Sequence, residues 1–133
     1  MTVRDIIERH PRPSNLDRDL LLRCIDECFD CSATCTACAD ACLGESDALD
    51  LIRAIRLSLD CAGVCDAVGR VVTRQTEIDL GVVRAAIEAC IVACRECGDE
   101  CERHAAHHDH CRVCMEVCRS CEQACRDLLA SVG

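Results

Sequence analysis

Aromatic residues are almost absent from this chain of 133 residues, which has one phenylalanine, Phe29, and no tryptophan or tyrosine. A core of ordinary composition uses several aromatic side chains to fill its volume. Their absence indicates that other side chains occupy the centre of the protein, and the 17 cysteines are the candidates. Proline and glycine are also scarce, with two and six residues, so little interrupts long helices.

Lysine is absent as well, and 15 arginines face 24 acidic residues. The net charge of −9 argues against a nucleic-acid partner, because binding nucleic acid requires a basic face. The sequence lacks a run of ~18 apolar residues, so we expect neither a membrane-spanning helix nor a membrane partner. Residues 1–8 lack the apolar region and cleavage site of a signal peptide. We therefore expect a cytoplasmic protein.

Periodic apolar positions divide the chain into a polar lead segment, residues 1–14, and one domain, residues 15–133. Helix-capping residues mark the ends of the expected helices: Ser14 or Asn15, Gly44, Ser46 or Asp47, and Asp109. The expected helices span residues 15–43, 47–73, 82–106 and 109–131. Four long helices with short links predict an all-α protein, an antiparallel up-down-up-down four-helix bundle with a cysteine-lined core.

The cysteines recur at alternating steps of three and four residues in three of the four expected helices, which is the spacing of positions that face the core of a bundle. Sixteen of them form eight Cys-x-x-x-Cys pairs, which places two sulfurs one above the other on a helix face. Cys111 is left over, four residues after His107. The cysteines are Cys24, Cys28, Cys31, Cys35, Cys38, Cys42, Cys61, Cys65, Cys90, Cys94, Cys97, Cys101, Cys111, Cys114, Cys118, Cys121 and Cys125.

Two ordinary explanations of these cysteines are weak. Buried cysteine can act as a small hydrophobe, but a core of 17 oxidisable thiols has no packing advantage over alanine, valine or leucine. A disulfide framework is disfavoured by the odd count, by the expected reducing compartment and by helix geometry. Metal binding by thiolates is the interpretation that remains.

Thiolate-rich sites select copper(I), zinc or iron–sulfur clusters. Copper(I) suits continuous stripes, because it accepts two or three thiolates and thiolates can bridge neighbouring ions. About one copper(I) per thiolate also leaves the interior neutral, which matters because buried net charge is costly. A zinc or general soft-metal buffer of metallothionein type and an iron–sulfur electron carrier remain alternatives. We find no set of catalytic groups and expect no enzymatic activity.

The sequence resembles the bacterial copper storage proteins, and most closely their cytosolic branch. The resemblance rests on the repeated Cys-x-x-x-Cys pairs, the four-helix layout and the histidine-rich turn at residues 107–110. The similarity covers about residues 15–130. It implies storage or sequestration of multiple Cu(I) ions per chain, a role in metal homeostasis, and a homotetramer. No copper chaperone or other delivery partner can be named from the sequence.

The two ends of the expected bundle differ. One end has Cys42, Cys101 and Cys111 with two histidines, His104 and His108, that continue a cysteine stripe and that we predict to be metal ligands. The other end is aliphatic, with Leu20, Leu21, Val68, Val72, Val83, Ile87 and Leu128. We therefore expect copper to enter at the histidine end, where the start of the last helix should lower the pKa of Cys111.

Other residues near the histidine end receive lesser roles. We interpret His107 and His110 as solvated turn residues and Met115 as packing filler. The lead-segment histidine, His10, is taken as incidental. Apolar residues away from the cysteine stripes are too numerous for a polar exterior and predict helix seams and a subunit interface. They are Leu22, Ile25, Phe29, Ile52, Ile55, Leu59, Ile91, Val92, Val113 and Val117.

Overall fold

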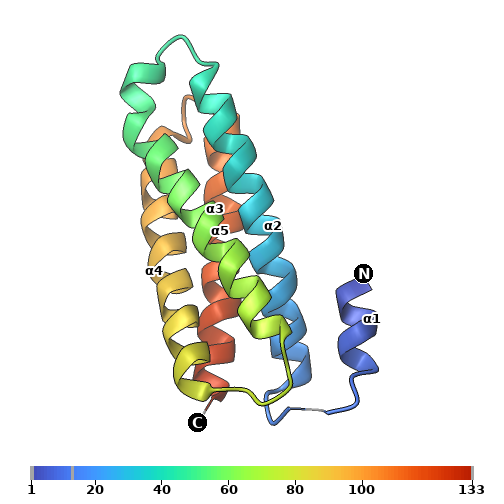
Figure 1. Ribbon diagram of the computed structural model, residues 1–133. Helices are drawn as coiled ribbons and strands as arrows, with labels where there is room; N and C mark the ends of the chain where they lie inside the picture. Colours follow the sequence, from blue (N-terminus) through green and yellow to red (C-terminus); the bar gives the residue numbers. More distant parts are fainter. Residues whose placement is uncertain (1, 13, 133) are drawn as a thin grey trace.

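A computed structural model describes residues 2–12 and 14–132, and within these residues the regular structure is entirely helical (Figure 1). The prediction of an all-α protein is confirmed. Residues 1, 13 and 133, which belong to the predicted lead segment and domain, lie outside the described residues. The elements are α1 (Thr2–Glu8), α2 (Arg18–Leu43), a 3₁₀ turn η1 (Ala48–Leu51), α3 (Ile52–Thr73), α4 (Leu80–His104) and α5 (Asp109–Ser131).

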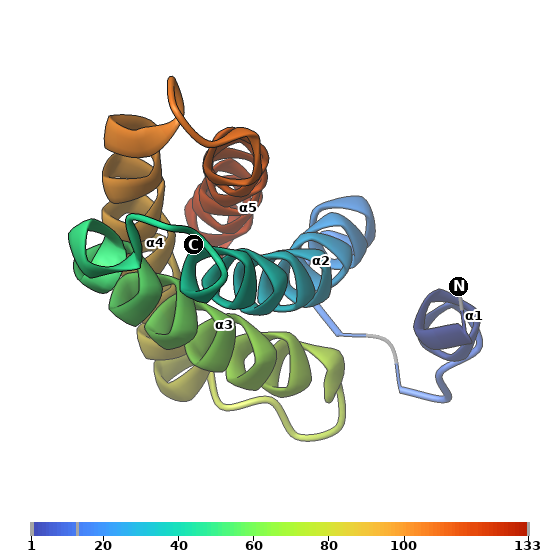
Figure 2. The same ribbon diagram turned by 90° about the horizontal axis from the view of Figure 1, so that it is seen from above.

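The four long helices, α2 to α5, lie side by side around a shared interior. The packed pairs are α2 with α3, α3 with α4, α4 with α5, and α5 with α2, which closes a ring. Figure 1 shows that consecutive long helices run in opposite directions, and Figure 2 shows the ring from above. Every cysteine lies in one of these helices and is buried, so the stripes predicted from the sequence all face the interior.

Several predicted boundaries were wrong by a few residues, because other side chains provide the caps. The first long helix begins at Arg18, where the Asp17 carboxylate accepts a hydrogen bond from the Leu20 amide at 3.0 Å. The third long helix begins at Leu80, because Asp79 caps it through the Val82 amide at 2.9 Å. The second is preceded by the unexpected turn η1 rather than by a capped first turn.

The start of α5 and the lead segment also differ from expectation. Asp109 is the first residue of α5 and not its cap, and no side chain caps this helix. The lead segment contains α1, which the sequence analysis missed. Its Ile7 side chain is buried, and Arg4 forms an ion pair with Asp26 of α2 at 3.3 Å. The apolar contacts of Ile7 and of the partly buried Val3, with this ion pair, thus attach a short helix to the bundle.

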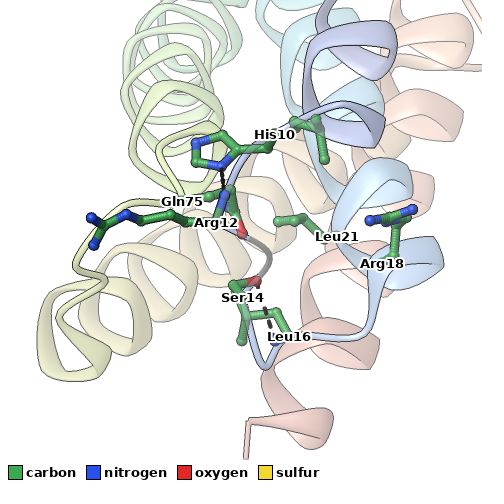
Figure 3. Close-up of a pocket in the computed structure, with 8 residues that line it drawn as sticks. His10, Arg12, Ser14, Leu16, Arg18, Leu21 and Gln75 are labelled. Atoms are coloured by element: carbon green, nitrogen blue, oxygen red, sulfur yellow. Dashed lines mark hydrogen bonds between the residues drawn. The ribbon is translucent and has the colours of Figure 1, made fainter.

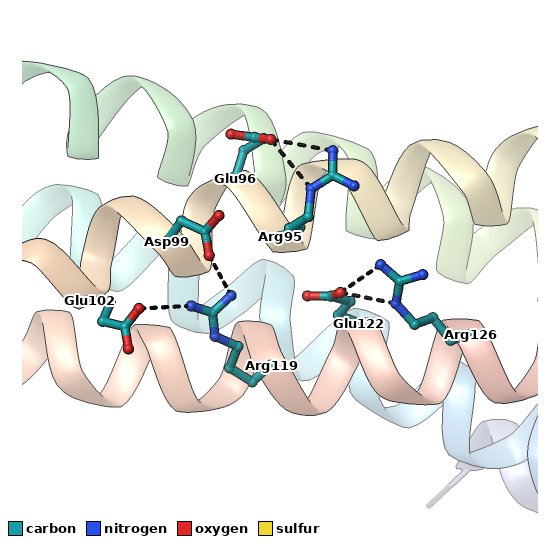
Figure 4. A network of polar contacts seen from close by, with 7 residues as sticks. All are labelled: Arg95, Glu96, Asp99, Glu102, Arg119, Glu122 and Arg126. Atoms are coloured by element: carbon teal, nitrogen blue, oxygen red, sulfur yellow. Dashed lines mark hydrogen bonds and ion pairs between the residues drawn. The ribbon is translucent and has the colours of Figure 1, made fainter.

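The outer surface of α4 and α5 carries several ion pairs. Arg119 of α5 reaches across to α4 and contacts Asp99 at 2.8 Å and Glu102 at 3.2 Å (Figure 4). Its guanidinium group lies against Gly98, where a Cβ atom would be 3.0 Å from a nitrogen of Arg119. Exposed ion pairs add little stability, so their main effect is to keep this face polar while the cysteines face inward. None of the described helices is apolar and long enough to span a membrane.

Candidate metal centre

The thiols form a closed column along the bundle axis. All 17 cysteines are free; 16 have no exposed surface, and Cys38 is 3% exposed. Sulfur atoms from different helices approach closely, as in Cys24 with Cys125 at 3.7 Å and Cys65 with Cys90 at 3.6 Å. Predicted i, i+4 pairs do the same within one helix, with 3.7 Å between the sulfurs of Cys61 and Cys65. The column therefore offers sulfur neighbours both along each helix and across the interior.

These sulfurs group into overlapping sets of four, each with all its ligand atoms within 4.8 Å of one another. Cys121 belongs to two sets, and so do Cys31, Cys35 and Cys118. Separate tetrahedral sites would need four ligands each, without sharing. The overlap instead suits ions that share bridging thiolates. The thiol-only sets include Cys28 with Cys90, Cys121 and Cys125; Cys31 with Cys65, Cys94 and Cys121; Cys31 with Cys35, Cys61 and Cys118; and Cys35 with Cys97, Cys114 and Cys118.

The spacing of the sulfurs also bears on coordination number. With a metal–sulfur bond of ~2.3 Å, two sulfurs around one ion are ~4.6 Å apart in a linear arrangement and ~4.0 Å apart in a trigonal one. The contacts Cys35–Cys118 at 3.6 Å and Cys31–Cys61 at 3.9 Å lie near the trigonal value and near the ~3.8 Å of a tetrahedral site. Small outward movements of side chains would bring the same pairs to the linear value, so the spacing permits two-, three- or four-coordinate ions, and the sharing of sulfurs between sets is what favours a soft ion with bridging thiolates.

A histidine joins the thiols at one end of the column. The Nδ1 atom of His110 lies 3.5 Å from the sulfur of Cys38, 3.7 Å from that of Cys111 and 4.0 Å from that of Cys42. These four side chains form a further set within 4.8 Å. His110 was predicted to be a solvated turn residue, but the structure turns it toward the thiols. Its position four residues before Cys114 was the available signal.

The two histidines predicted as ligands contact carboxylates in this structure. His104 Nε2 lies 3.0 Å from an oxygen of Glu100, which is itself buried. His108 lies between two acids, with Nε2 3.0 Å from Asp47 and Nδ1 3.0 Å from Glu45. The hydrogen bond to the Asp47 carboxylate raises the pKa of His108 above its ordinary value. Both imidazoles stand at the predicted end of the bundle, beside the column.

The remaining polar residues of this end behave differently. His107 is exposed in the turn, and Met115 is partly buried against the core. The prediction of a lowered pKa for Cys111 was wrong: burial raises its pKa to about 12. Removal of the thiol from water outweighs the field of the helix terminus, because the charged form loses its hydration. Cys111 is therefore a thiol at neutral pH until a metal replaces its proton.

The opposite end is closed by aliphatic side chains, as predicted. Six of the seven residues named from the sequence are buried, and Leu20 is half-buried. A cavity of 240 Å³ lies beside this end, lined by polar residues such as His10, Arg12 and Gln75 together with Ile7 and Leu21 (Figure 3). It contains no cysteine, so His10 stands apart from the thiol column.

One buried polar residue of the interior was missed altogether. Ser58 of α3 has no exposed surface, and its Oγ atom lies 3.6 Å from the sulfur of Cys97. The signal in the sequence was its spacing, because Ser58 precedes Cys61 by three residues and Cys65 by seven. Toward the histidine end, α3 then presents Ala54 and, through η1, Leu51, both buried.

Comparison with known proteins agrees with this geometry. Residues 17–130 match the family model described as copper storage protein. A search of curated proteins gives no match. Among solved structures, the chain is 52% identical to the copper storage protein Ccsp of Streptomyces lividans loaded with 10 copper equivalents, with a TM-score of 0.95 over 97% of this chain and 98% of that one.

Two further structures from Streptomyces lividans are similar. A cytosolic copper storage protein holding five coppers is 55% identical, with a TM-score of 0.85 over 86% of this chain and 96% of that one. A Ccsp variant with two histidine-to-alanine substitutions is 53% identical, with a TM-score of 0.86 over 87% of this chain and 98% of that one.

Proposed function

The chain belongs to the copper storage protein family, and from this premise we propose that it stores many copper(I) ions on the thiolates of its interior. The overlapping sets of four thiols carry the proposal, because shared members such as Cys31 and Cys118 suit bridging thiolates. Copper(I) is soft, accepts two or three sulfurs and brings one charge for each proton that a thiol loses. The loaded interior then stays close to neutral, whereas zinc on four thiolates would leave each site at −2.

We infer that α2 to α5 form an antiparallel up-down-up-down four-helix bundle within a domain of residues 15–133. The interior of this bundle holds the stored copper. The ligands we assign are the 17 cysteines with His104 and His108, and the contacts of His110 with three thiols add this residue to them. His108 has a carboxylate at each ring nitrogen and would have to leave Glu45 or Asp47 to bind an ion, so it suits transient binding during loading. His104 contacts Glu100 through Nε2, and Nδ1 is the nitrogen we assign to an ion.

The protein is proposed to hold copper without catalysing a reaction on it. A cytoplasmic location is proposed, and the similar cytosolic copper storage protein from Streptomyces lividans supports it. The acidic charge supports the absence of nucleic-acid and membrane partners. Any protein that delivers copper remains to be identified by experiment.

A homotetramer is the proposed assembly. Aliphatic residues predicted for an interface are exposed on three helices: Ile52 and Leu59 on α3, Val92 on α4 and Val113 on α5. Contact between subunits would remove these side chains from water. Native mass spectrometry of the apo-protein should give a mass four times that of the chain, and a monomer would contradict this assembly.

Anaerobic titration of the reduced apo-protein with copper(I) tests the storage proposal. We expect roughly 15–20 ions per chain before free copper is detected, because two-coordinate bridged sites approach one ion per thiolate. About one proton should be released per ion bound at cysteine, so binding should weaken as the pH falls. A plateau at four or five ions per chain, with spectra that indicate tetrahedral coordination, would contradict copper storage and favour the zinc alternative. A brown protein as purified would indicate the iron–sulfur alternative.

A further inference from the structure

Ser58 occupies a position in the interior where the pattern of α3 would place a cysteine. It stands on the same helix face as Cys61 and Cys65, and it has no exposed surface. A hydroxyl group buried among thiols needs a hydrogen-bond partner, because an unpaired one is costly. Alanine would fill this place without that cost, as Ala54 does one turn away on α3. The presence of a hydroxyl therefore calls for an explanation.

The partner of Ser58 is a thiol of the metal column. Its Oγ atom lies 3.6 Å from the sulfur of Cys97 on α4. Cys97 forms a set of four with Cys35, Cys114 and Cys118, which come from α2 and α5. The neighbouring set deeper in the bundle receives Cys61 from α3. Ser58 is thus the side chain that α3 presents to the Cys97 set in place of a thiol.

Loading with copper fixes the direction of this hydrogen bond. In the apo-protein either the hydroxyl or the thiol can be the donor. When copper(I) binds, the Cys97 thiol loses its proton to solvent and a sulfur–copper bond forms, so the sulfur can only accept. The Ser58 hydroxyl is then the donor of a charge-assisted bond, which is stronger than a neutral one. The hydroxyl oxygen itself is a hard donor atom and a poor ligand for a soft ion.

The neighbours of Cys97 in its set of four, Cys35, Cys114 and Cys118, are all thiols of the column. These thiols lose their own protons when they bind copper, and they then cease to be donors. The Ser58 hydroxyl keeps its hydrogen throughout, so it alone of these contacts persists in the loaded protein.

We propose that Ser58 is a positioning residue for copper, and that its hydroxyl donates to the copper-bound Cys97 thiolate and strengthens binding at this sulfur. In this way α3 stabilises the loaded column at the level where it has no cysteine. The inference rests on the proposed storage of copper(I). It concerns the affinity of one site and leaves the capacity of the protein unchanged.

Two substitutions test the proposal from opposite sides. Ser58→Ala removes the hydroxyl and should leave the number of bound ions unchanged. About one ion per chain should then be lost to a copper(I) chelator at a chelator concentration roughly tenfold lower than the wild-type protein requires. A tenfold loss of affinity is the effect expected when a hydrogen bond to a charged group is removed. Ser58→Cys, which is nearly isosteric, should give 18 free thiols on unfolding, hold one more copper(I) ion and release one more proton.

Ser32→Ala is the matched control. Ser32 also lies on a long helix and donates one hydrogen bond, at 2.9 Å to the backbone oxygen of Ala62, but that bond does not involve a sulfur. Its loss should leave copper competition at the wild-type level.

Three outcomes would overturn the inference. The first is wild-type competition in Ser58→Ala, and the second is an equal effect in Ser32→Ala. The third is a Ser58→Cys protein with 18 thiols that holds no additional copper, because position 58 would then not face the column; this measurement also decides the matter if Ser58→Ala fails to fold. A wild-type protein that does not bind many copper(I) ions would instead refute the storage proposal itself.

Discussion

The Nδ1 nitrogen of His110 lies 3.5 Å from the sulfur of Cys38, which places an imidazole in direct contact with the end of the thiol column. Cys42 and Cys111 complete this group. The other ring nitrogen, Nε2, lies 3.4 Å from a carboxylate oxygen of Glu45 but forms no hydrogen bond with it. The contacts with the thiols are all made through Nδ1. His110 therefore has the arrangement of a ligand at the boundary between column and solvent.

Replacing this histidine should affect copper specifically. In His110→Ala, we expect the capacity to fall by about one ion per chain, because one soft nitrogen ligand is removed. The ions nearest Cys38 should also transfer faster to a chelator. The matched control is His107→Ala, which changes an exposed residue in the turn before α5 and should behave as wild type. Equal effects of the two substitutions in stopped-flow chelator removal would contradict a ligand role for His110.

Copper is expected to enter and leave at the histidine end of the bundle. Replacing both His104 and His108 with leucine should slow loading and chelator-driven removal, while the capacity falls by only a few ions. The reason is that incoming copper needs replacement ligands, and the aliphatic end around Val72 and Ile87 offers none. The control enlarges that end with Val72→Leu and should leave both rates unchanged. If the control slows both rates and the histidine variant does not, the entrance lies at the aliphatic end.

The apo-protein should be folded, helical and fully reduced. Aliphatic residues such as Leu21, Ile25 and Leu128 are buried independently of any metal, in contrast to a zinc finger, whose folding depends on its ion. Circular dichroism under anaerobic, reducing conditions should show a helical spectrum without copper. Thiol counting after unfolding should give 17 groups per chain. A random-coil spectrum before loading would show that the bundle needs copper to form.

Two glycines of α3 should respond oppositely to alanine. At Gly69, an added Cβ would lie 3.0 Å from two ring carbons of Phe29 on α2, so Gly69→Ala should lower the free energy of unfolding by about 1–3 kcal/mol through overpacking. At Gly63 no atom lies within 4 Å of such a Cβ. Gly63→Ala should therefore raise the free energy of unfolding by about 0.5–1 kcal/mol, because alanine has the higher helix propensity. Urea denaturation of the apo-protein measures both. Similar shifts in the same direction would mean that Phe29 does not restrict the contact between α2 and α3.

The periodicity of the cysteines determined much of this protein. Steps of three and four residues place side chains on one helix face, and a face of thiols on each of four helices can only be buried where the faces meet. The burial of all 17 cysteines follows from this pattern, and so does the aliphatic closure of one end. Helix ends were less certain, since Asp17 and not Ser14 or Asn15 caps α2.

Local sequence was uninformative where the contacts are between distant segments. The short helix α1 was missed because it is attached through contacts to other helices, such as the ion pair of Arg4 with Asp26. The pKa of Cys111 was assigned the wrong direction for the same reason. Position in a helix can be read from sequence, but the depth of burial that raises this pKa depends on the elements that cover the residue.

The sequence by itself determined the all-helical class, the thiol stripes and the soft-metal chemistry, because helical period and ligand type are local properties of the chain. Only the tertiary structure decided which sulfurs share neighbours and which imidazole meets the thiols. It directs His110 to Cys38 while His108 lies between Glu45 and Asp47, although the two histidines are only two residues apart in the sequence. The physical reason is that these contacts join α5 to α2 and to the link before α3, and the packing of whole helices fixes such distances.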